Sequence, residues 1–276
     1  MDFENVLILI QKELRDAFRN RWFLLYAIAF TALSLALAWF SVSGAGSFGV
    51  AGFGRTTAGL INLILLIVPL MGLTLGAMSV AGEREKGTLV YLLAQPISSA
   101  ELLLGKFVGL SLALTAALVI GFGLTGILIA FMGSGGDFMV YLTLLVLSIL
   151  LAVASLSMGF LISAAVKKAA TAVGLALFLW LILVYFGDLG LMGTSMVMQI
   201  DVQQLLALAL INPLQVFKLA AVLDLRDNLE VLGPAGIYAF RAYGQTLWPL
   251  LIGLLFSWVL VPFALATQAF KKRGVL

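Results

Sequence analysis

Histidine and cysteine are both absent from the 276 residues of this chain. Disulfide bonds, thiolate or imidazole metal sites, and catalysis by histidine or cysteine are therefore excluded. Charge is also scarce, because Asp, Glu, Lys and Arg make up 11% of the residues, against about 25% in an average soluble protein. Apolar residues make up 63%, and the mean hydropathy is +1.15. A soluble protein could not cover so much apolar surface, so we expect an integral membrane protein.

Six apolar stretches are long enough to cross about 30 Å of hydrocarbon. None of them contains a charged residue, and none shows the alternation of a barrel strand. The pattern predicts an all-α, polytopic membrane protein whose residues 1–276 form a single transmembrane domain. The six helices are predicted over residues 22–42, 58–82, 107–131, 140–165, 170–187 and 247–267. Two glycine pairs, Gly72 with Gly76 and Gly105 with Gly109, favour close contacts between these helices.

The distribution of basic residues predicts the orientation. If both termini lie in the cytoplasm, twelve of the sixteen basic residues lie inside. They include the short-loop pair Lys167-Lys168 and the terminal run Lys271-Lys272-Arg273. Basic residues concentrate on the cytoplasmic side of membrane proteins. We therefore expect an N-in, C-in topology.

Residues 1–21 are predicted to form an amphipathic helix at the inner membrane surface, regular over 3–19. Apolar residues recur there at helical spacing, and the charged residues occupy the other side. The apolar set is Phe3, Val6, Leu7, Ile10, Leu14 and Phe18, and the charged set is Lys12, Glu13, Arg15, Asp16 and Arg19. The alternative is a basic flank without defined structure that only sets the topology.

The segment 188–246 is predicted to lie outside the cytoplasm. Asp201 can cap a helix over about 202–211, and Asn212-Pro213 has the pattern of an N-cap with proline at the first helical position. Both helices carry many apolar residues, so we expect the segment to enter the outer half of the bilayer or to pack over the helix bundle.

The longest inner loop, residues 83–106, holds the most informative pattern. Glu83 and Glu85 lie near the start of a short helical stretch, and Pro96 ends it. Leu89, Leu92 and Leu93 share one face of that stretch, and Ser98 with Glu101 forms a capping box for the next helix. An apolar face on a water-exposed hairpin indicates a docking site for a soluble partner. The alternative is an ordinary hairpin on the membrane surface.

This loop resembles the coupling region of the type-2 ABC exporter permeases. The similarity is carried by Gly82-Glu83-x-Glu85-x-Gly87-Thr88-Leu89, Leu92-Leu93, Pro96 and Glu101-Leu102-Leu103-Leu104-Gly105-Lys106. It extends to Lys12-Glu13-Leu14-x-Asp16, Arg19-Asn20-Arg21-Trp22, Val68-Pro69-Leu70, Asn212-Pro213 and Phe217-Lys218-Leu219.

The resemblance implies a multi-pass permease of the bacterial inner membrane that is not itself an enzyme. It implies a homodimer, two copies of a cytoplasmic ATPase that bind the ATP and Mg²⁺, contacts with membrane lipid, and neither a cofactor in this chain nor a nucleic-acid partner. The residues that it assigns to ATPase coupling are Glu83, Arg84, Glu85, Lys86, Gly87, Thr88, Leu89, Leu92, Leu93 and Pro96.

Within the family, Gly52-Phe53-Gly54 and residues 66–106 are most similar to permeases that assist copper-centre maturation of nitrous oxide reductase. That similarity implies a periplasmic β-helical partner. Met192, Met196 and Met198 are the candidate Cu(I) ligands, but methionine also fills gaps in apolar packing, so we expect no metal in this chain. The alternatives are a generic exporter permease for a lipid, peptide or drug, and a membrane anchor or intramembrane enzyme, for which the chain offers no catalytic set.

The charge-free spans bear on the mechanism. Ion-coupled carriers keep acidic or basic residues within the membrane as relays, and the predicted spans contain none. We therefore expect energy to arrive from outside the bilayer, as motion transmitted through the inner loop. That motion would serve either the passage of a cargo or a mechanical action on an outer partner.

Overall fold

The computed structural model describes residues 3–43, 49–131, 138–185, 187, 201–224 and 233–273. Within these ranges the chain is helical except for short connections, and no strand occurs. Its helices are α1 (Phe3–Arg19), α2 (Arg21–Ser43), α3 (Gly49–Glu85), α4 (Thr88–Leu93), α5 (Ser99–Phe131), α6 (Phe138–Ala165), α7 (Ala169–Tyr185), α9 (Val202–Ile211), α10 (Pro213–Asp224), α11 (Gly233–Tyr243), the 3-10 turn η3 (Gly244–Thr246) and α12 (Leu247–Arg273). The all-α prediction is confirmed.

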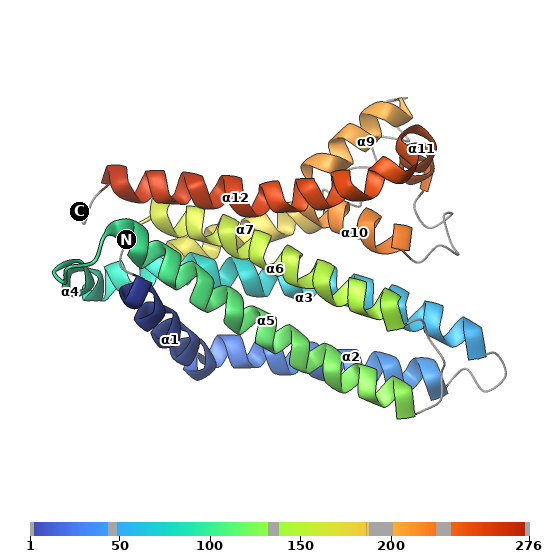
Figure 1. Cartoon of the computed structure of the whole chain (residues 1–276), viewed down its shortest axis with the longest axis horizontal. Coiled ribbons are helices and arrows are strands. Elements are labelled where there is room, and N and C mark those ends of the chain that lie inside the picture. The colour runs from blue at the N-terminus through green and yellow to red at the C-terminus, as the bar shows by residue number, and fades with distance from the viewer. Residues whose placement is uncertain are drawn as a thin grey trace.

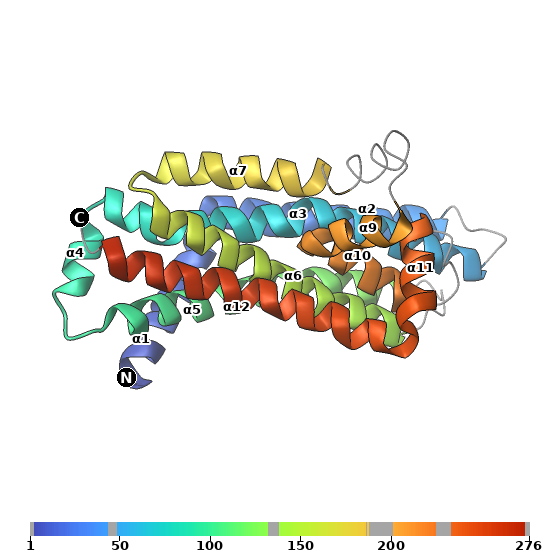
Figure 2. The same ribbon diagram turned by 90° about the horizontal axis from the view of Figure 1, so that it is seen from above.

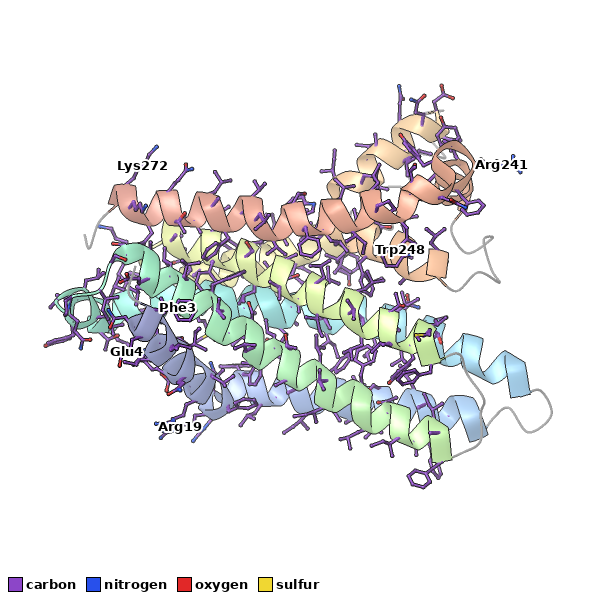
Figure 3. The ribbon with its side chains drawn as sticks, viewed as in Figure 1. Phe3, Glu4, Arg19, Arg241, Trp248 and Lys272 are labelled. Atoms are coloured by element: carbon purple, nitrogen blue, oxygen red, sulfur yellow. The ribbon has the colours of Figure 1, made fainter. Side chains whose placement is uncertain are left out.

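The long helices run side by side along one axis and form an elongated bundle (Figure 1). Both ends of the chain lie at the end of the bundle that carries α4, and α9 and α11 lie at the opposite end. Side chains follow the same division: Glu4 and Lys272 lie at the α4 end, and Arg241 lies at the other (Figure 3). This arrangement agrees with an N-in, C-in topology, in which the α4 end is the inner end of the bundle.

Five helical stretches are long and apolar enough to cross a membrane. They are Arg21–Phe40, Thr57–Glu85, Ser99–Phe131, Phe138–Ala165 and Tyr238–Lys272, and they correspond to five of the six predicted spans. The remaining prediction, 170–187, coincides with α7, an apolar helix of 17 residues that is about 25 Å long and flanks α3 (Figure 2). The helices extend beyond several of the predicted spans: α3 begins at Gly49 and not at 58, α5 begins at Ser99 and not at 107, and α12 ends at Arg273 and not at 267.

The predicted outer helices are present as α9 and α10. They meet at a bend of 111°, where Asn212 Oδ1 accepts the backbone N–H of Leu214 at 3.0 Å, as expected of an N-cap before Pro213. Asn212 Nδ2 donates to the carbonyl of Leu183 at 2.7 Å, which attaches the bend to α7. Asp201 stands at the N-cap of α9, but its side chain makes no capping hydrogen bond.

Both predicted glycine contacts occur. A Cβ on Gly72 of α3 would lie 2.6 Å from the carbonyl oxygen of Ala152 in α6, so the two helices touch at their backbones. A Cβ on Gly105 of α5 would lie 2.5 Å from Leu9 Cβ in α1, and one on Gly109 would lie 2.8 Å from Glu13 Cβ. These small residues allow α3 to pack on α6, and α1 on α5, at short range.

The helix α1 confirms the predicted helix over 3–19, but its faces differ from the prediction. Phe3 and Phe18 are exposed, whereas Glu13, which was expected on the charged outer side, is buried. The close approach of α1 to the glycines of α5 explains this burial. It turns Glu13 toward α5 together with Val6, whereas Phe3, Leu7 and Phe18 stay exposed, where the membrane surface would cover them.

Candidate functional site

The inner hairpin between α3 and α5 is built from local signals. Gly87 has a φ of 73°, a left-handed conformation in which a side chain would be strained, and it separates α3 from α4. Before α5, the backbone N–H of Ser98 donates to Glu101 Oε2 at 2.9 Å, and the N–H of Glu101 donates to Ser98 Oγ at 3.2 Å. The predicted capping box is confirmed. It determines where α5 begins and therefore how far α4 projects.

The apolar face of α4 points in the opposite direction from the one predicted. Leu89 is 1% exposed, and Leu92 and Leu93 pack against the same core. The exposed apolar side chains are Val90 at 54% and Tyr91 at 77%. Helical spacing shows which residues share a face, but not which way that face turns. Here the leucines cover the inner end of the bundle, and Val90 and Tyr91 are the exposed apolar residues of α4.

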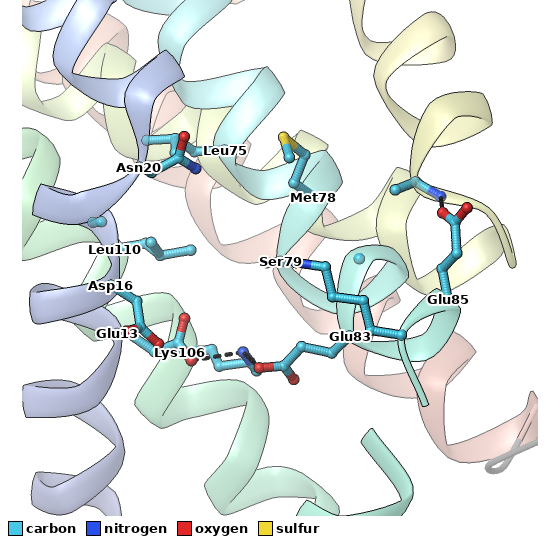
Figure 4. A pocket seen from close by; sticks show the side chains of 14 residues that line it. Glu13, Asp16, Asn20, Leu75, Met78, Ser79, Glu83, Glu85, Lys106 and Leu110 are labelled. Atoms are coloured by element: carbon cyan, nitrogen blue, oxygen red, sulfur yellow. Dashed lines mark hydrogen bonds and ion pairs between the residues drawn. The ribbon is translucent and has the colours of Figure 1, made fainter. Parts of the chain in front are cut away.

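Lys106 is the centre of a charged cluster that the sequence did not reveal. Its side chain is 1% exposed, although it comes from α5, one of the membrane-crossing helices. Its ammonium lies 2.7 Å from Glu13 Oε1 of α1 and 2.7 Å from Glu83 Oε1 of α3 (Figure 4). A buried charge is tolerated when it is paired in this way. Lys106 therefore joins three helices at the inner end. The signal for this role was its position beside Gly105, on the face of α5 that contacts α1.

Lys12 extends the cluster to its exposed side. Its ammonium lies 3.1 Å from both Glu13 Oε1 and Glu83 Oε1, and 3.8 Å from Asp16 Oδ2. Burial lowers the pKa of Lys12, but the attraction of Glu13 and Glu83 and the hydrogen bonds to them outweigh it and raise the pKa above its ordinary value. Lys12 is thus held in its charged form, and two ammonium groups face the two carboxylates.

The next two residues of α3 hold the short loop between α6 and α7. Arg84 Nη1 donates to the carbonyl of Val166 at 2.6 Å, and Glu85 Oε2 accepts the backbone N–H of Ala169 at 2.7 Å. A carboxylate at the first N–H of a helix is favourable, because it satisfies an open donor and opposes the helix dipole. The acids predicted to face a partner are thus engaged within the chain: Glu83 with Lys106, and Glu85 with α7.

A cavity of about 470 Å³ lies among α1, α3, α5 and the start of α7 (Figure 4). Its charged lining residues are Glu13, Asp16, Glu83, Glu85, Lys86 and Lys106. One oxygen of the lining, Glu83 Oε2, is buried and has no hydrogen-bond partner in the part of the chain that the structure describes.

The acidic side chains of the cluster do not form a metal site. No group of three or more His, Cys, Asp or Glu side chains that could hold a metal ion occurs within the described ranges. The candidate copper ligands Met192, Met196 and Met198 lie outside the described residues.

Comparison with known proteins gives two findings. A family model described as "ABC-2 family transporter protein" matches residues 7–275. A protein of Stutzerimonas stutzeri named "Probable ABC transporter permease protein NosY" is 31% identical over 95% of this chain and 96% of its own length. A protein of the same name from Pseudomonas aeruginosa is 34% identical over 98% of this chain and 99% of its own length.

Proposed function

The chain belongs to the ABC-2 family of transporter proteins, and from that premise we propose that its inner hairpin couples it to a separate cytoplasmic ATPase. The chain is the permease subunit of an ABC transporter and a multi-pass protein of the bacterial inner membrane. The hairpin stands at the inner end of the bundle, where a soluble ATPase could reach it.

The exposure of Val90 and Tyr91 carries the proposal. The two side chains stand on α4 at the inner end, beyond the ends of the spans, and are 54% and 77% exposed. Tyrosine is enriched at the centres of protein interfaces, because its ring is large and rigid and its hydroxyl can still hydrogen-bond. We assign these two residues to the ATPase contact, together with the exposed residues Lys86 and Thr88 at the start of the hairpin.

The other residues that the resemblance assigns to coupling do not touch the ATPase in this proposal, but connect α4 to the rest of the chain. Leu89, Leu92 and Leu93 anchor α4 on the bundle, Gly87 and Pro96 bound it, and Glu83, Arg84 and Glu85 attach it to other helices. A displacement of α4 would therefore reach α1 through Glu83 and Lys106, and α7 through Glu85. It would reach the outer half of the membrane through α3, which is continuous over 37 residues.

The unit of action in this proposal is a homodimer of this chain with two ATPase subunits. ATP and Mg²⁺ are bound and used in those partner subunits. In this chain the hairpin receives the motion, and residues 188–246 deliver it at the outer surface. Within that segment, α9 and α10 are bent against each other and tied to α7 by Asn212, so motion of α7 would reach them directly.

On the outer side, we propose action on a periplasmic β-helical partner of the NosD kind, in copper-site assembly of nitrous oxide reductase. The name NosY, borne by both relatives, supports this assignment. Copper would be cargo of the assembly, and the absence of histidine and cysteine favours mechanical action over copper binding by this chain. The second candidate is a generic exporter permease for a lipid, peptide or drug, which the uncharged spans also suit.

The chain's lack of cysteine allows a direct test of the docking face. A Tyr91→Cys variant carries a single thiol, which a thiol-to-amine crosslinker can join to lysines of the co-expressed ATPase. We expect a permease–ATPase adduct. The matched control is Tyr185→Cys, since Tyr185 is also exposed but lies at the outer end of α7. Equal labelling of the ATPase from both positions, or none from position 91, would refute docking through α4.

A further inference from the structure

The cavity at the inner end has the size and chemistry of a ligand site, and of the residues assigned to the ATPase contact only Lys86 lines it. Its volume is about 470 Å³, within the roughly 300–1,000 Å³ of small-molecule sites. Figure 4 shows it between α1 and α3, with Asp16 and Asn20 on one side and Met78 and Ser79 on the other. It is distinct from the exposed face of α4, because neither Val90 nor Tyr91 lines it.

The charges of the lining favour a cation. Four carboxylates line the cavity, against the ammonium groups of Lys86 and Lys106 in the lining and of Lys12 beside it, which leaves one carboxylate in excess. Lys106 is committed to Glu13 and to Oε1 of Glu83. Glu83 Oε2 remains buried without a donor among the described residues, which is costly for a charged oxygen. Asp16, at 55% side-chain exposure, has within the described ranges only a long ion pair of 3.8 Å with Lys12. Two acceptors are therefore available for a ligand that donates hydrogen bonds.

The cation is expected to be organic and attached to an apolar body. The acids do not form a group that could hold a metal ion within the described ranges. Leu75, Met78 and Leu110 give the cavity an apolar side, and they belong to α3 and α5, which continue into the membrane. The cavity also lies beside α1, whose exposed side chains Phe3, Leu7 and Phe18 suit the membrane surface. An amphiphile with a cationic head at the inner membrane surface matches these features.

We propose that this cavity binds the headgroup of an inner-leaflet phospholipid that carries a primary ammonium, the chemistry of phosphatidylethanolamine. The ammonium would donate to Glu83 Oε2 and Asp16, and the phosphate would face Lys86 at the rim, an exposed lysine without an ion pair among the described residues. A primary ammonium has three N–H donors, whereas the quaternary ammonium of phosphatidylcholine has none. The site therefore discriminates between two headgroups of equal charge.

The test measures which lipid the full-length chain retains. The protein is purified from nanodiscs that contain equal amounts of phosphatidylethanolamine and phosphatidylcholine with matched acyl chains, and the bound lipid is counted by native mass spectrometry. We expect preferential retention of phosphatidylethanolamine by the wild type. Asp16→Asn, which leaves both pairs of Lys106 intact, should reduce the preference by about tenfold, the effect of losing one charged hydrogen bond. Glu83→Gln should reduce it as well.

The control variant is Glu4→Gln, which removes an exposed carboxylate of the same helix outside the cavity and should keep the preference. Spermidine is added in a parallel arm, because a free amine offers the same donors without acyl chains. Retained spermidine that displaces the lipid would overturn the lipid assignment. Equal retention of the two phospholipids by the wild type, or a preference that survives Asp16→Asn, would overturn the site itself. None of these readouts requires the ATPase, so docking through α4 stands or falls separately.

Discussion

Glu85 Oε2 of α3 lies 2.7 Å from the backbone nitrogen of Ala169, the first residue of α7. A side chain of the membrane-crossing helix α3 thus satisfies an open donor at the start of α7, which follows α5 and α6 in the chain. Glu85 is a natural candidate for a partner contact because it is acidic and stands on an inner loop. In the structure Glu85 also holds the start of α7. A substitution of Glu85 would therefore change both the stability of the chain and any contact with a partner.

We predict that Glu85→Ala lowers the stability of the permease before any partner is present. Loss of a capping carboxylate costs about 1 kcal/mol, and the start of α7 would loosen. Glu85→Gln, which keeps an acceptor oxygen, should cost less. The measurement is thermal unfolding of the purified chain in detergent, with Lys86→Ala as the neighbouring exposed control. Identical melting temperatures for Glu85→Ala and Lys86→Ala would show that the contact with Ala169 is dispensable.

Lys106→Met is predicted to be the most damaging substitution at the inner end. It leaves Glu13 and Glu83 paired only with the partly exposed Lys12, and breaking a buried ion pair costs about 3–5 kcal/mol. The triple variant Glu13→Gln, Glu83→Gln, Lys106→Met should regain much of the loss, since no buried charge is then left alone. The yield of monodisperse protein on gel filtration measures both, and Lys271→Met serves as the exposed control. If Lys106→Met alone were as stable as the wild type, Lys106 would not hold α1, α3 and α5 together as we describe.

Gly159→Ala tests the contact between α3 and α6. A Cβ at this position would lie 2.5 Å from the carbonyl oxygen of Leu73, whereas one at Gly174 or Gly253 meets nothing within 4 Å. We expect Gly159→Ala to lower the melting temperature by forcing the helices apart, and Gly174→Ala and Gly253→Ala to leave it unchanged. If all three variants have the same melting temperature, α3 and α6 do not depend on a close backbone contact at Gly159.

Replacement of Met192, Met196 and Met198 by leucine tests whether this chain handles copper. Leucine keeps the apolar volume and removes the three thioethers of this cluster, and thioether sulfur is the only soft ligand type in the chain. We predict nearly unchanged copper content of the matured partner enzyme, because the proposed role is mechanical. Severe copper loss at normal permease abundance would instead assign a Cu(I) site to this cluster.

Much of the architecture could be predicted because the bilayer imposes it. Length, apolarity and absence of charge predicted the helices that became α2, α3, α5, α6 and α12, and Ser98 with Glu101 predicted the start of α5. Gly105 and Gly109 predicted a close contact, although not that α1 would be the partner. These signals depend only on composition or on residues close together in the sequence, so they can be recognised without knowing how the helices pack.

What could not be predicted depends on how helices turn toward one another. The spacing of Leu89, Leu92 and Leu93 predicts that they share one face, but only the structure shows that this face packs inward. Glu13 and Glu83 are 70 positions apart, and only the three-dimensional arrangement brings both of them to Lys106. For the same reason, a double substitution of Glu83 and Glu85 would not leave folding untouched, because each residue holds a second helix. Val90 and Tyr91 are therefore the cleaner probes of the docking face.

Co-purification of the ATPase with a Tyr91→Ala, Val90→Ala permease tests the central claim most directly. Both side chains point away from the bundle, so insertion and folding should be unaffected. If they fill a pocket on the ATPase, their loss should cost about 2 kcal/mol or more. We predict that the ATPase no longer co-purifies in detergent and that ATP turnover of the mixture is no longer responsive to the permease. Wild-type recovery of the ATPase with wild-type turnover would contradict coupling through α4.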